Sequence, residues 1–180
     1  MGGSGLAASD SHLSEDILQN LITLVGVALF IVAAYRDVKT FRIPNVLVAA
    51  VALLAVLRLI VIGDPNVALY TVGASFALLI VGFVLFWQGF IGGGDAKLIT
   101  AAALLIGYND LFPSLLLMGI GGGVISLTAL AIHKYLPLYL GPRLTLLSPK
   151  TRLAVPYGVA IATAGSVTLF LQTSLPSFIG

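Results

Sequence analysis

Long apolar segments, separated by short polar ones, run along almost the whole chain of 180 residues and leave few folds open. Apolar residues make up 59% of the chain and charged residues only 9%, and the mean hydropathy is +1.10. A soluble domain carries about 25% charged residues, whereas about 20 consecutive apolar residues are enough for a helix to cross a bilayer. The sequence therefore predicts an all-α, polytopic membrane protein.

Six apolar segments are the expected transmembrane helices of a single bundle. They are residues 17–35, 46–62, 67–90, 96–107, 111–132 and 153–172. The fourth is short, so either it is partly re-entrant or the glycines before it lie below the membrane surface. A polar tail, residues 1–16, precedes the membrane domain of residues 17–172, and a short tail, residues 173–180, follows.

Two polar stretches are not expected to cross the membrane. The tail of residues 1–16 starts with the composition of an artificial linker and has no Lys or Arg, so we predict no secretory signal peptide there. Residues 133–152 contain three prolines and are expected to form a loop.

The basic residues orient the expected bundle. Eight of the nine fall in three segments that six spans place on one side, whereas the intervening turns contain Asp64 and Asp110 and no cation. Those eight are Arg36, Lys39, Arg42, Lys97, Lys134, Arg143, Lys150 and Arg152. The positive-inside rule makes these segments cytoplasmic and both termini non-cytoplasmic. The ninth, Arg58, is expected to reach the outer interface toward Asp64, and whether it has a function stays open.

Asp37 and Asp95 are the only acids expected on the cytoplasmic side. Two close carboxyl groups cannot both ionise cheaply, so they titrate as a pair. One can take a proton from water while the other polarises a peptide carbonyl and protonates the leaving nitrogen. Two plainer interpretations stay open: Asp37 pairs with Arg36 or Lys39, and Asp95 is a helix N-cap.

Three glycines, Gly92, Gly93 and Gly94, come directly before Asp95. Because glycine has no side chain, we expect this stretch to leave space for the extended backbone of a substrate. Lys97 follows, and it either extends to the membrane surface or tunes or pairs with an acid.

Other segments are compatible with a site without proving one. Pro44 suits a helix start, and Asn45 can cap a helix or bind a backbone. In the run Pro156, Tyr157, Gly158, the proline either frees a carbonyl that can bind a peptide or only kinks the helix. The glycines at 119 and 123 have a spacing that predicts close helix packing.

Composition also excludes several classes of site. The chain has no cysteine, so disulfides and cysteine-bound zinc are excluded. Its two histidines, His12 and His133, lack metal-ligand spacing, so we expect neither a metal nor a cofactor. The net charge of +2 is too small to indicate nucleic acid as a partner.

Taken in order, three motifs resemble one family. They are Asp37 with Arg42-Ile43-Pro44-Asn45, then Gly92-Gly93-Gly94-Asp95-Ala96-Lys97-Leu98, then Pro156-Tyr157-Gly158-Val159-Ala160. Together, over residues 17–172, they resemble the type IV prepilin peptidases, which are intramembrane aspartyl proteases of the G-x-G-D type. The resemblance implies a peptidase that removes the basic leader of prepilins at the cytoplasmic face of the bacterial inner membrane. It implies Asp37 and Asp95 as the catalytic pair, with the prepilin's leader and apolar helix, and membrane lipid, as partners.

The sequence departs from the larger members of that family. They carry an N-terminal cytoplasmic insertion with paired cysteines and an N-methyltransferase activity, so we predict no methyltransferase here. The compact form is similar to the small peptidases of tight-adherence (Flp-type) pilus systems, and an archaeal preflagellin peptidase is a related alternative.

Two other classes of function stay open. A small proton-coupled transporter can use the same two aspartates as a relay, although transporter sites usually lie near the bilayer midplane. A non-enzymatic pilus assembly subunit is the third hypothesis. The sequence leaves the oligomeric state undetermined.

Overall fold

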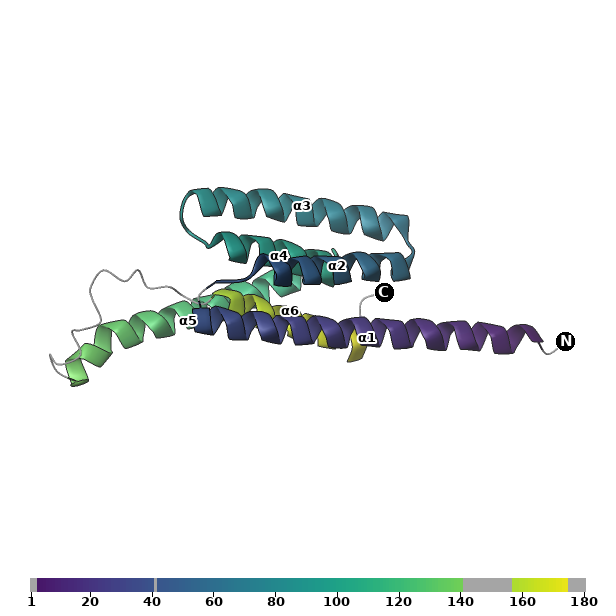
Figure 1. Cartoon of the computed structure of the whole chain (residues 1–180), viewed down its shortest axis with the longest axis horizontal. Helices are drawn as coiled ribbons and strands as arrows, with labels where there is room; N and C mark the ends of the chain where they lie inside the picture. Colours follow the sequence, from purple (N-terminus) through teal and green to yellow (C-terminus); the bar gives the residue numbers. More distant parts are fainter. Residues whose placement is uncertain (1–2, 41, 141–156, 175–180) are drawn as a thin grey trace.

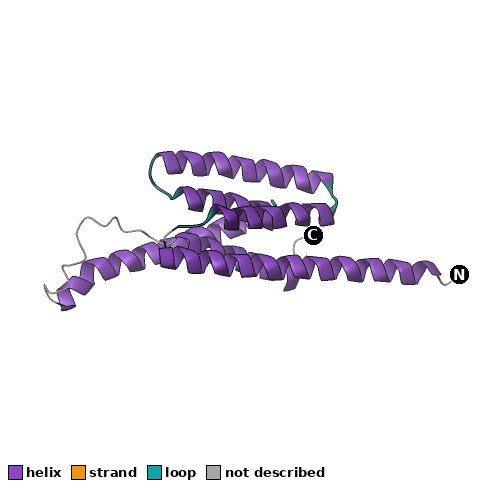
Figure 2. Ribbon diagram, in the orientation of Figure 1, coloured by secondary structure: helices purple, strands orange, loops and turns teal. Residues whose placement is uncertain are grey.

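The computed structural model describes residues 3–40, 42–140 and 157–174, and within them every regular element is a helix. The bounds are α1 Gly3–Thr40, α2 Asn45–Ile62, α3 Pro65–Trp87, α4 Gly93–Ile106, α5 Leu111–Leu140 and α6 Tyr157–Ser174 (Figures 1 and 2). The all-α prediction is confirmed.

Two helices continue beyond the expected spans. Helix α1 begins at Gly3, so most of the polar tail is helical, and Figure 1 shows this part extending beyond the other helices, while the part apolar enough to cross a membrane starts at Ile17 as expected. Helix α5 continues to Leu140, although a loop was expected from residue 133. The proline at 137 suggested an end because it lacks a backbone donor, but continuing the helix keeps the neighbouring backbone groups paired. The rest of the expected loop, residues 141–152, lies outside the described residues, as do residues 153–156 at the start of the expected sixth span.

The helices form two groups that meet through α4 and α6. Helix α4 packs against α2 and α3, while α6 packs against α1 and α5. Contacts of α1 with α2 and of α4 with α6 join the groups, and Figure 1 shows α3 on the far side of α4 from α1. Helices α4 and α6 are therefore the central ones.

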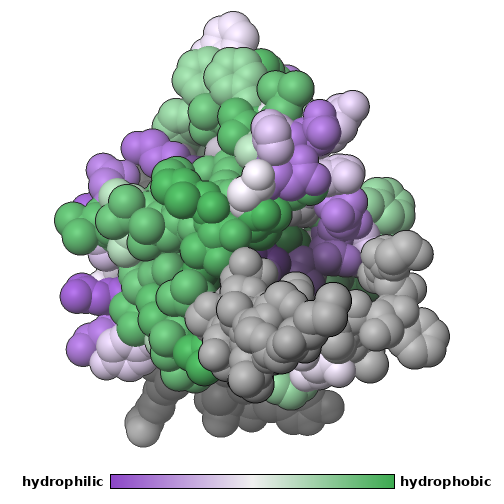
Figure 3. All heavy atoms as spheres, turned by 90° about the vertical axis from the view of Figure 1, so that its right-hand side faces the viewer, coloured by the Kyte–Doolittle hydropathy of each residue, from purple (hydrophilic) through white to green (hydrophobic). Residues whose placement is uncertain are grey.

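Four helical segments are long and apolar enough to cross a membrane: Ile17–Thr40, Asn45–Ile62, Pro65–Trp87 and Leu111–Thr128. Helices α4 and α6 are not among them, so the count of six spans stays a prediction. Both are enclosed by other helices, which reduces the apolar surface they need to present to lipid. Hydrophobic atoms cover much of the outer surface in Figure 3, which views the molecule from the right-hand side of Figure 1.

One stripe of α1 faces the centre of the bundle. Gly26, Phe30, Ala33 and Asp37 are buried and recur every three or four residues, which is the spacing of one helix face. A methyl group on Gly26 would lie 3.0 Å from Leu169 Cδ1, and side chains of α2 and α4 are also within 4 Å. Helices α1, α2, α4 and α6 therefore meet at this point, and the same stripe ends at Asp37.

The glycine spacing in α5 was misinterpreted. A methyl group added at Gly119 or Gly123 would have no atom of the described fold within 4 Å, so these two glycines do not mediate close packing. The intervening Gly121 and Gly122 do, because they face Ala160 and Tyr157 of α6. Close packing does occur on α5, but it involves Gly121 and Gly122 and not the two glycines of the predicted motif.

We expect Gly165→Ala to lower the thermal stability of the detergent-solubilised protein. Its new methyl group would lie 2.6 Å from Phe30 Cε2, and overpacking of this kind costs about 1–3 kcal/mol. The control is Gly73→Ala in α3, where nothing lies within 4 Å and alanine favours the helix. Equal melting temperatures for the two variants would contradict this account of the α1–α6 interface.

Candidate active site

The fold brings Asp37 and Asp95 to the same end of the bundle. Asp37 lies in the last turns of α1, and Asp95 lies in the first turn of α4. Because α1 runs toward the end at which α4 begins, the two carboxyl groups come close enough for their charges to interact (Figure 1). The expected pairing of the two acids therefore has a structural basis.

Asp37 is buried against the N-terminus of α6. Its side chain is 4% exposed, and a methyl group on Gly158 would lie only 2.7 Å from its Oδ2 atom. The backbone N–H groups of Gly158 and Val159 approach the carboxyl group, and a helix N-terminus favours negative charge. Within the described residues, Oδ2 has no hydrogen-bond partner.

The plainer interpretation of Asp37, an interfacial ion pair, is not what the structure shows. Arg36 and Lys39 are both exposed, whereas Asp37 is buried. The Lys39 ammonium group instead lies 3.5 Å from the hydroxyl group of Tyr35 and 5.7 Å from the centre of its ring. Asp37 therefore faces the bundle interior while its neighbouring cations face outward.

Asp95 does not cap α4 in the expected way. The N-cap is Gly92, and Asp95 is the third residue of the helix. From there its carboxyl group reaches back to the backbone N–H of Gly92, as the acid of a capping box does. Its side chain is half-buried, so one side of the group stays accessible.

The environment of Asp95 favours its protonated form. The residue precedes the expected fourth span and lies outside the four segments able to cross a membrane. Burial, and then the negative charge of Asp37, raise the pKa of Asp95 to about 6. Asp95 therefore keeps its proton at mildly acidic pH, where an ordinary carboxyl group is ionised.

The three glycines make room for the protein's own side chains. A methyl group on Gly92 would lie 2.9 Å from Asp95 Oδ2, one on Gly93 would lie 3.2 Å from the Phe86 ring, and one on Gly94 would lie 3.3 Å from Ile43 Cβ. Space for a substrate backbone beside this stretch stays a prediction.

The start of α2 is attached to the start of α4. Pro44 is the N-cap of α2, and its carbonyl accepts the backbone N–H of Leu47 at 3.0 Å. Ile43 is buried against Gly94, and Lys97 Nζ donates to the side-chain oxygen of Asn45 at 3.2 Å. Lys97 is thus bonded to a neutral amide.

The start of α6 is attached to α5. A methyl group on Gly122 would lie 3.5 Å from the Tyr157 ring, and the Ser126 hydroxyl donates to the Tyr157 hydroxyl at 3.4 Å. Gly158, one residue on, contacts Asp37. Pro156, which we expected to expose a carbonyl near the acids, lies outside the described residues.

Arg58 does not extend toward Asp64, contrary to expectation. It donates to backbone carbonyls at the C-terminus of α4 and to the side chain of Gln172. Asp64 instead caps α3 by accepting the backbone N–H of Asn66 at 2.8 Å. Gln172 was not among the residues predicted from the sequence, although it is the one side-chain amide in the last apolar segment and so a natural partner for an intramembrane arginine.

A family model described as the type IV leader peptidase family matches residues 24–127, which is more than half of the chain. The chain belongs to the type IV leader peptidase family. No curated protein and no solved structure matches it. Membership confirms the resemblance noted above and supports a protease that acts on prepilin leaders, and the apolar helices support a membrane protein.

The matched region of this leader peptidase contains both Asp37 and Asp95. In the described part of the chain, no three His, Asp or Glu side chains form a cluster able to hold a metal ion. Two interacting carboxyl groups, one of them with a raised pKa, lie at this end of the bundle.

We expect Gly158→Ala to abolish or strongly reduce peptidase activity while the protein still inserts into membranes. The methyl group would overlap the Asp37 carboxyl group, which must then move away from the start of α6. Prepilin processing in liposomes measures the effect, with Gly73→Ala as the matched control. Normal processing by Gly158→Ala would show that the position of Asp37 against α6 is unimportant.

We also expect Asp95→Asn to stabilise the peptidase more at pH 7 than at pH 4.5. The folded-state pKa of about 6 lies above the reference value of 3.8, so the folded state binds more protons than the unfolded state between these values. Stability therefore falls as pH rises through this window, and the variant lacks this loss. Melting temperatures at the two pH values measure the difference.

The same comparison in an Asp37→Asn background should give a smaller difference, because one of the two causes of the raised pKa is gone. A pH effect of equal size in both backgrounds would mean that the two carboxyl groups do not interact.

Proposed function

We propose that this leader peptidase is an intramembrane aspartyl endopeptidase that removes the basic leader of prepilins, with Asp37 and Asp95 as its catalytic residues. The observation that carries the proposal is the convergence of two buried or half-buried acids, from α1 and α4, at one end of the bundle. A carboxyl group is costly inside an apolar bundle, so a pair of them indicates a function.

The surroundings of the two acids favour different roles. Burial disfavours a charge on either acid, but the N-terminus of α6 lies against Asp37 and counteracts this effect, so we assign Asp37 as the base. Asp95, with its raised pKa, is assigned as the acid. Its half-exposed side is then the side from which a substrate and a water molecule approach.

Hydrolysis then needs only these two groups and water. Asp37 removes a proton from the water as its oxygen attacks the carbonyl carbon of the scissile peptide, while the Asp95 proton stabilises the developing oxyanion. Collapse of the tetrahedral intermediate breaks the C–N bond, and the proton held by the pair passes to the leaving nitrogen. The products are a free carboxyl group and a free amine, and the pair again holds one proton.

The exposed cations support a cytoplasmic location for this site in the bacterial inner membrane. Arg36, Lys39, Arg42 and Lys97 lie at the same end as the acid pair. Such cations favour the cytoplasmic side. Because a basic leader is repelled by these residues, anionic lipid headgroups attract it instead, by about 1 kcal/mol per Lys or Arg.

We further propose that the enzyme is a peptidase without methyltransferase activity, of the form found in tight-adherence (Flp-type) pilus systems. Only residues 41–44 connect α1 to α2, which leaves no insertion between these helices. The chain also lacks the paired cysteines associated with that insertion in larger members.

We expect Asp37→Asn and Asp95→Asn each to reduce prepilin cleavage by about 10²- to 10⁴-fold, the usual contribution of general acid–base catalysis. The exposed Asp64 provides the control, because Asp64→Asn makes the same chemical change in the turn before α3, and asparagine is an equally good N-cap. Cleavage of a prepilin panel in liposomes, with the cut bond read by mass spectrometry, gives both the rate and the substrate.

Full processing by either Asp37→Asn or Asp95→Asn would refute the aspartyl mechanism. Proton flux into liposomes that is lost in Asp95→Asn, without peptidase activity in the parent protein, would favour a transporter. Pilus assembly that survives loss of both acids would favour a structural subunit.

A further inference from the structure

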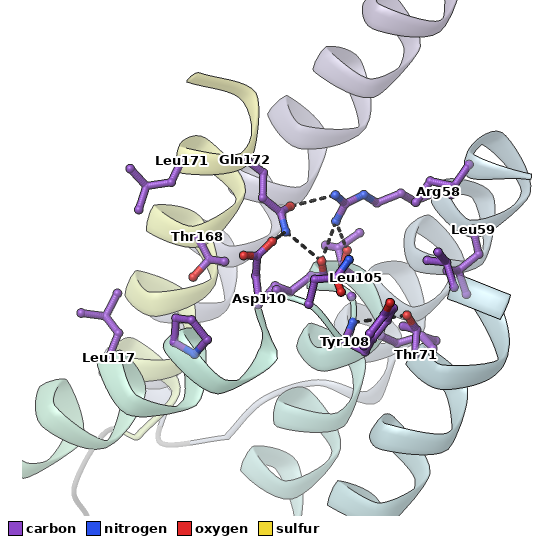
Figure 4. A pocket seen from close by; sticks show the side chains of 17 residues that line it. Arg58, Leu59, Thr71, Leu105, Tyr108, Asp110, Leu117, Thr168, Leu171 and Gln172 are labelled. Atoms are coloured by element: carbon purple, nitrogen blue, oxygen red, sulfur yellow. Dashed lines mark hydrogen bonds between the residues drawn. The ribbon is translucent and has the colours of Figure 1, made fainter. Parts of the chain in front are cut away.

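A polar cluster lies at the end of the bundle opposite the acid pair. It consists of Arg58 from α2, Gln172 from α6 and Asp110 from the turn after α4, and it lines a cavity of about 410 Å³ (Figure 4). Arg58 Nη2 donates to Gln172 Oε1 at 2.8 Å, and Gln172 Nε2 donates to Asp110 Oδ2. The proposed catalysis uses none of these three residues.

The cluster caps the C-terminus of α4. Arg58 Nη1 donates to the carbonyl oxygen atoms of Leu105 and Ile106, the latter at 3.1 Å, and Gln172 Nε2 donates to that of Ile106 at 2.9 Å. The last carbonyls of any helix lack partners within the helix, and a cation there also interacts favourably with the helix dipole. Side chains from α2 and α6 thus hold the same end of α4.

The hydrogen bonds of Arg58 and Gln172 reinforce a contact, between α4 and α6, whose side-chain packing does little to fix the relative position of the two helices. Helix α4 packs less extensively against α6 than against α2 or α3. Both helices bury mainly small side chains, which allow close approach but offer little that interlocks. The buried alanines are Ala96, Ala101, Ala102 and Ala103 in α4 and Ala160, Ala162 and Ala164 in α6.

The axial register of these two helices matters because both carry parts of the candidate site. Asp95 lies at the start of α4, and Gly158, which contacts Asp37, lies at the start of α6. Helix α4 is 14 residues long, or about 21 Å at 1.5 Å per residue. A slip at its C-terminus therefore displaces Asp95 at the other end by the same amount.

We propose that Arg58 and Gln172, supported by Asp110, are positioning residues that set the axial register of α4 against α6 and thereby hold Asp95 beside Asp37. The proposal rests on the peptidase function for its kinetic consequences, but its structural consequence can be measured without any activity.

The kinetic test compares Arg58→Leu and Gln172→Ala with the parent enzyme, after normalisation to the folded fraction by gel filtration. We expect kcat to fall at least about 10-fold and KM to stay unchanged, because displacement of a reacting group by about 1 Å can cost 10²-fold. The control is Asn66→Ala, which removes an exposed amide at the same end of the bundle.

The pH dependence of kcat separates positioning from simple destabilisation. With Asp37 farther away, its charge raises the pKa of Asp95 less, so the alkaline limb of the profile moves to lower pH. Loss of folded protein alone leaves the limb in place. Arg58→Lys keeps a cation and several donors, so it should restore the limb toward its original position.

The other charged groups near Asp95 are not altered by these substitutions. Among the residues whose side chains the structure describes, the charged ones at this end are Asp37, Arg36 and Lys39 from α1, Arg42 from the connection to α2, and Lys97 from α4 itself. The neighbouring elements contribute the uncharged Asn45 from α2, Phe86 from α3, and Tyr157 and Gly158 from α6.

The structural test uses the absence of native cysteine, which allows two spin labels to be placed without background. Labels at Lys97→Cys in α4 and Thr163→Cys in α6, both exposed positions, report the register directly. We expect the distance distribution to shift or broaden in Arg58→Leu and Gln172→Ala and to stay unchanged in Asn66→Ala. Unchanged distances together with an unchanged alkaline limb would overturn the proposal, whether or not Asp37 and Asp95 prove catalytic.

Discussion

The structure depends on how two carboxyl groups can be kept inside an apolar bundle. Two helix N-termini converge on the acids. The first turn of α6 lies against Asp37, and α4 begins within three residues of Asp95. Each N-terminus presents backbone N–H groups and partial positive charge. The bundle thus offers negative charge an environment that apolar side chains alone do not provide.

This arrangement requires helices that begin inside the bundle, and it explains why α4 is short. A helix of only 14 residues that is enclosed by other helices has unpaired backbone groups at both ends that need partners inside the bundle. At its start the Asp95 side chain and the segment around Ile43 fill this role, and at its end Arg58 and Gln172 do. Polar side chains of neighbouring segments therefore contact α4 at both of its ends.

The sequence predicted the helices and the acid pair because both follow from local patterns. Apolar segments define helices, and alternation of helices places every second connection at the same end, so Asp37 and Asp95 had to lie at one end. Contacts across helices were not predictable in this way. The glycines before Asp95 turned out to face Phe86 and Ile43, and Arg58 turned inward to α4, because neighbours distant in sequence determine which side of a residue is free. The extension of α5 past residue 133 was missed for a different reason: a proline weakens a helix locally but does not have to end it.

The buried stripe of α1 also determines which changes of chain length the protein can tolerate. Asp37 occupies the same face as Gly26, Phe30 and Ala33, so its direction is set by the angle through which the helix turns between them. Each residue adds about 100° of rotation. Inserting or deleting one residue between Phe30 and Asp37 would turn the acid out of the bundle, whereas adding seven would return it to nearly the same angle but displace it along the axis. The number of residues between Phe30 and Asp37 is therefore constrained as strictly as the identity of the acid itself.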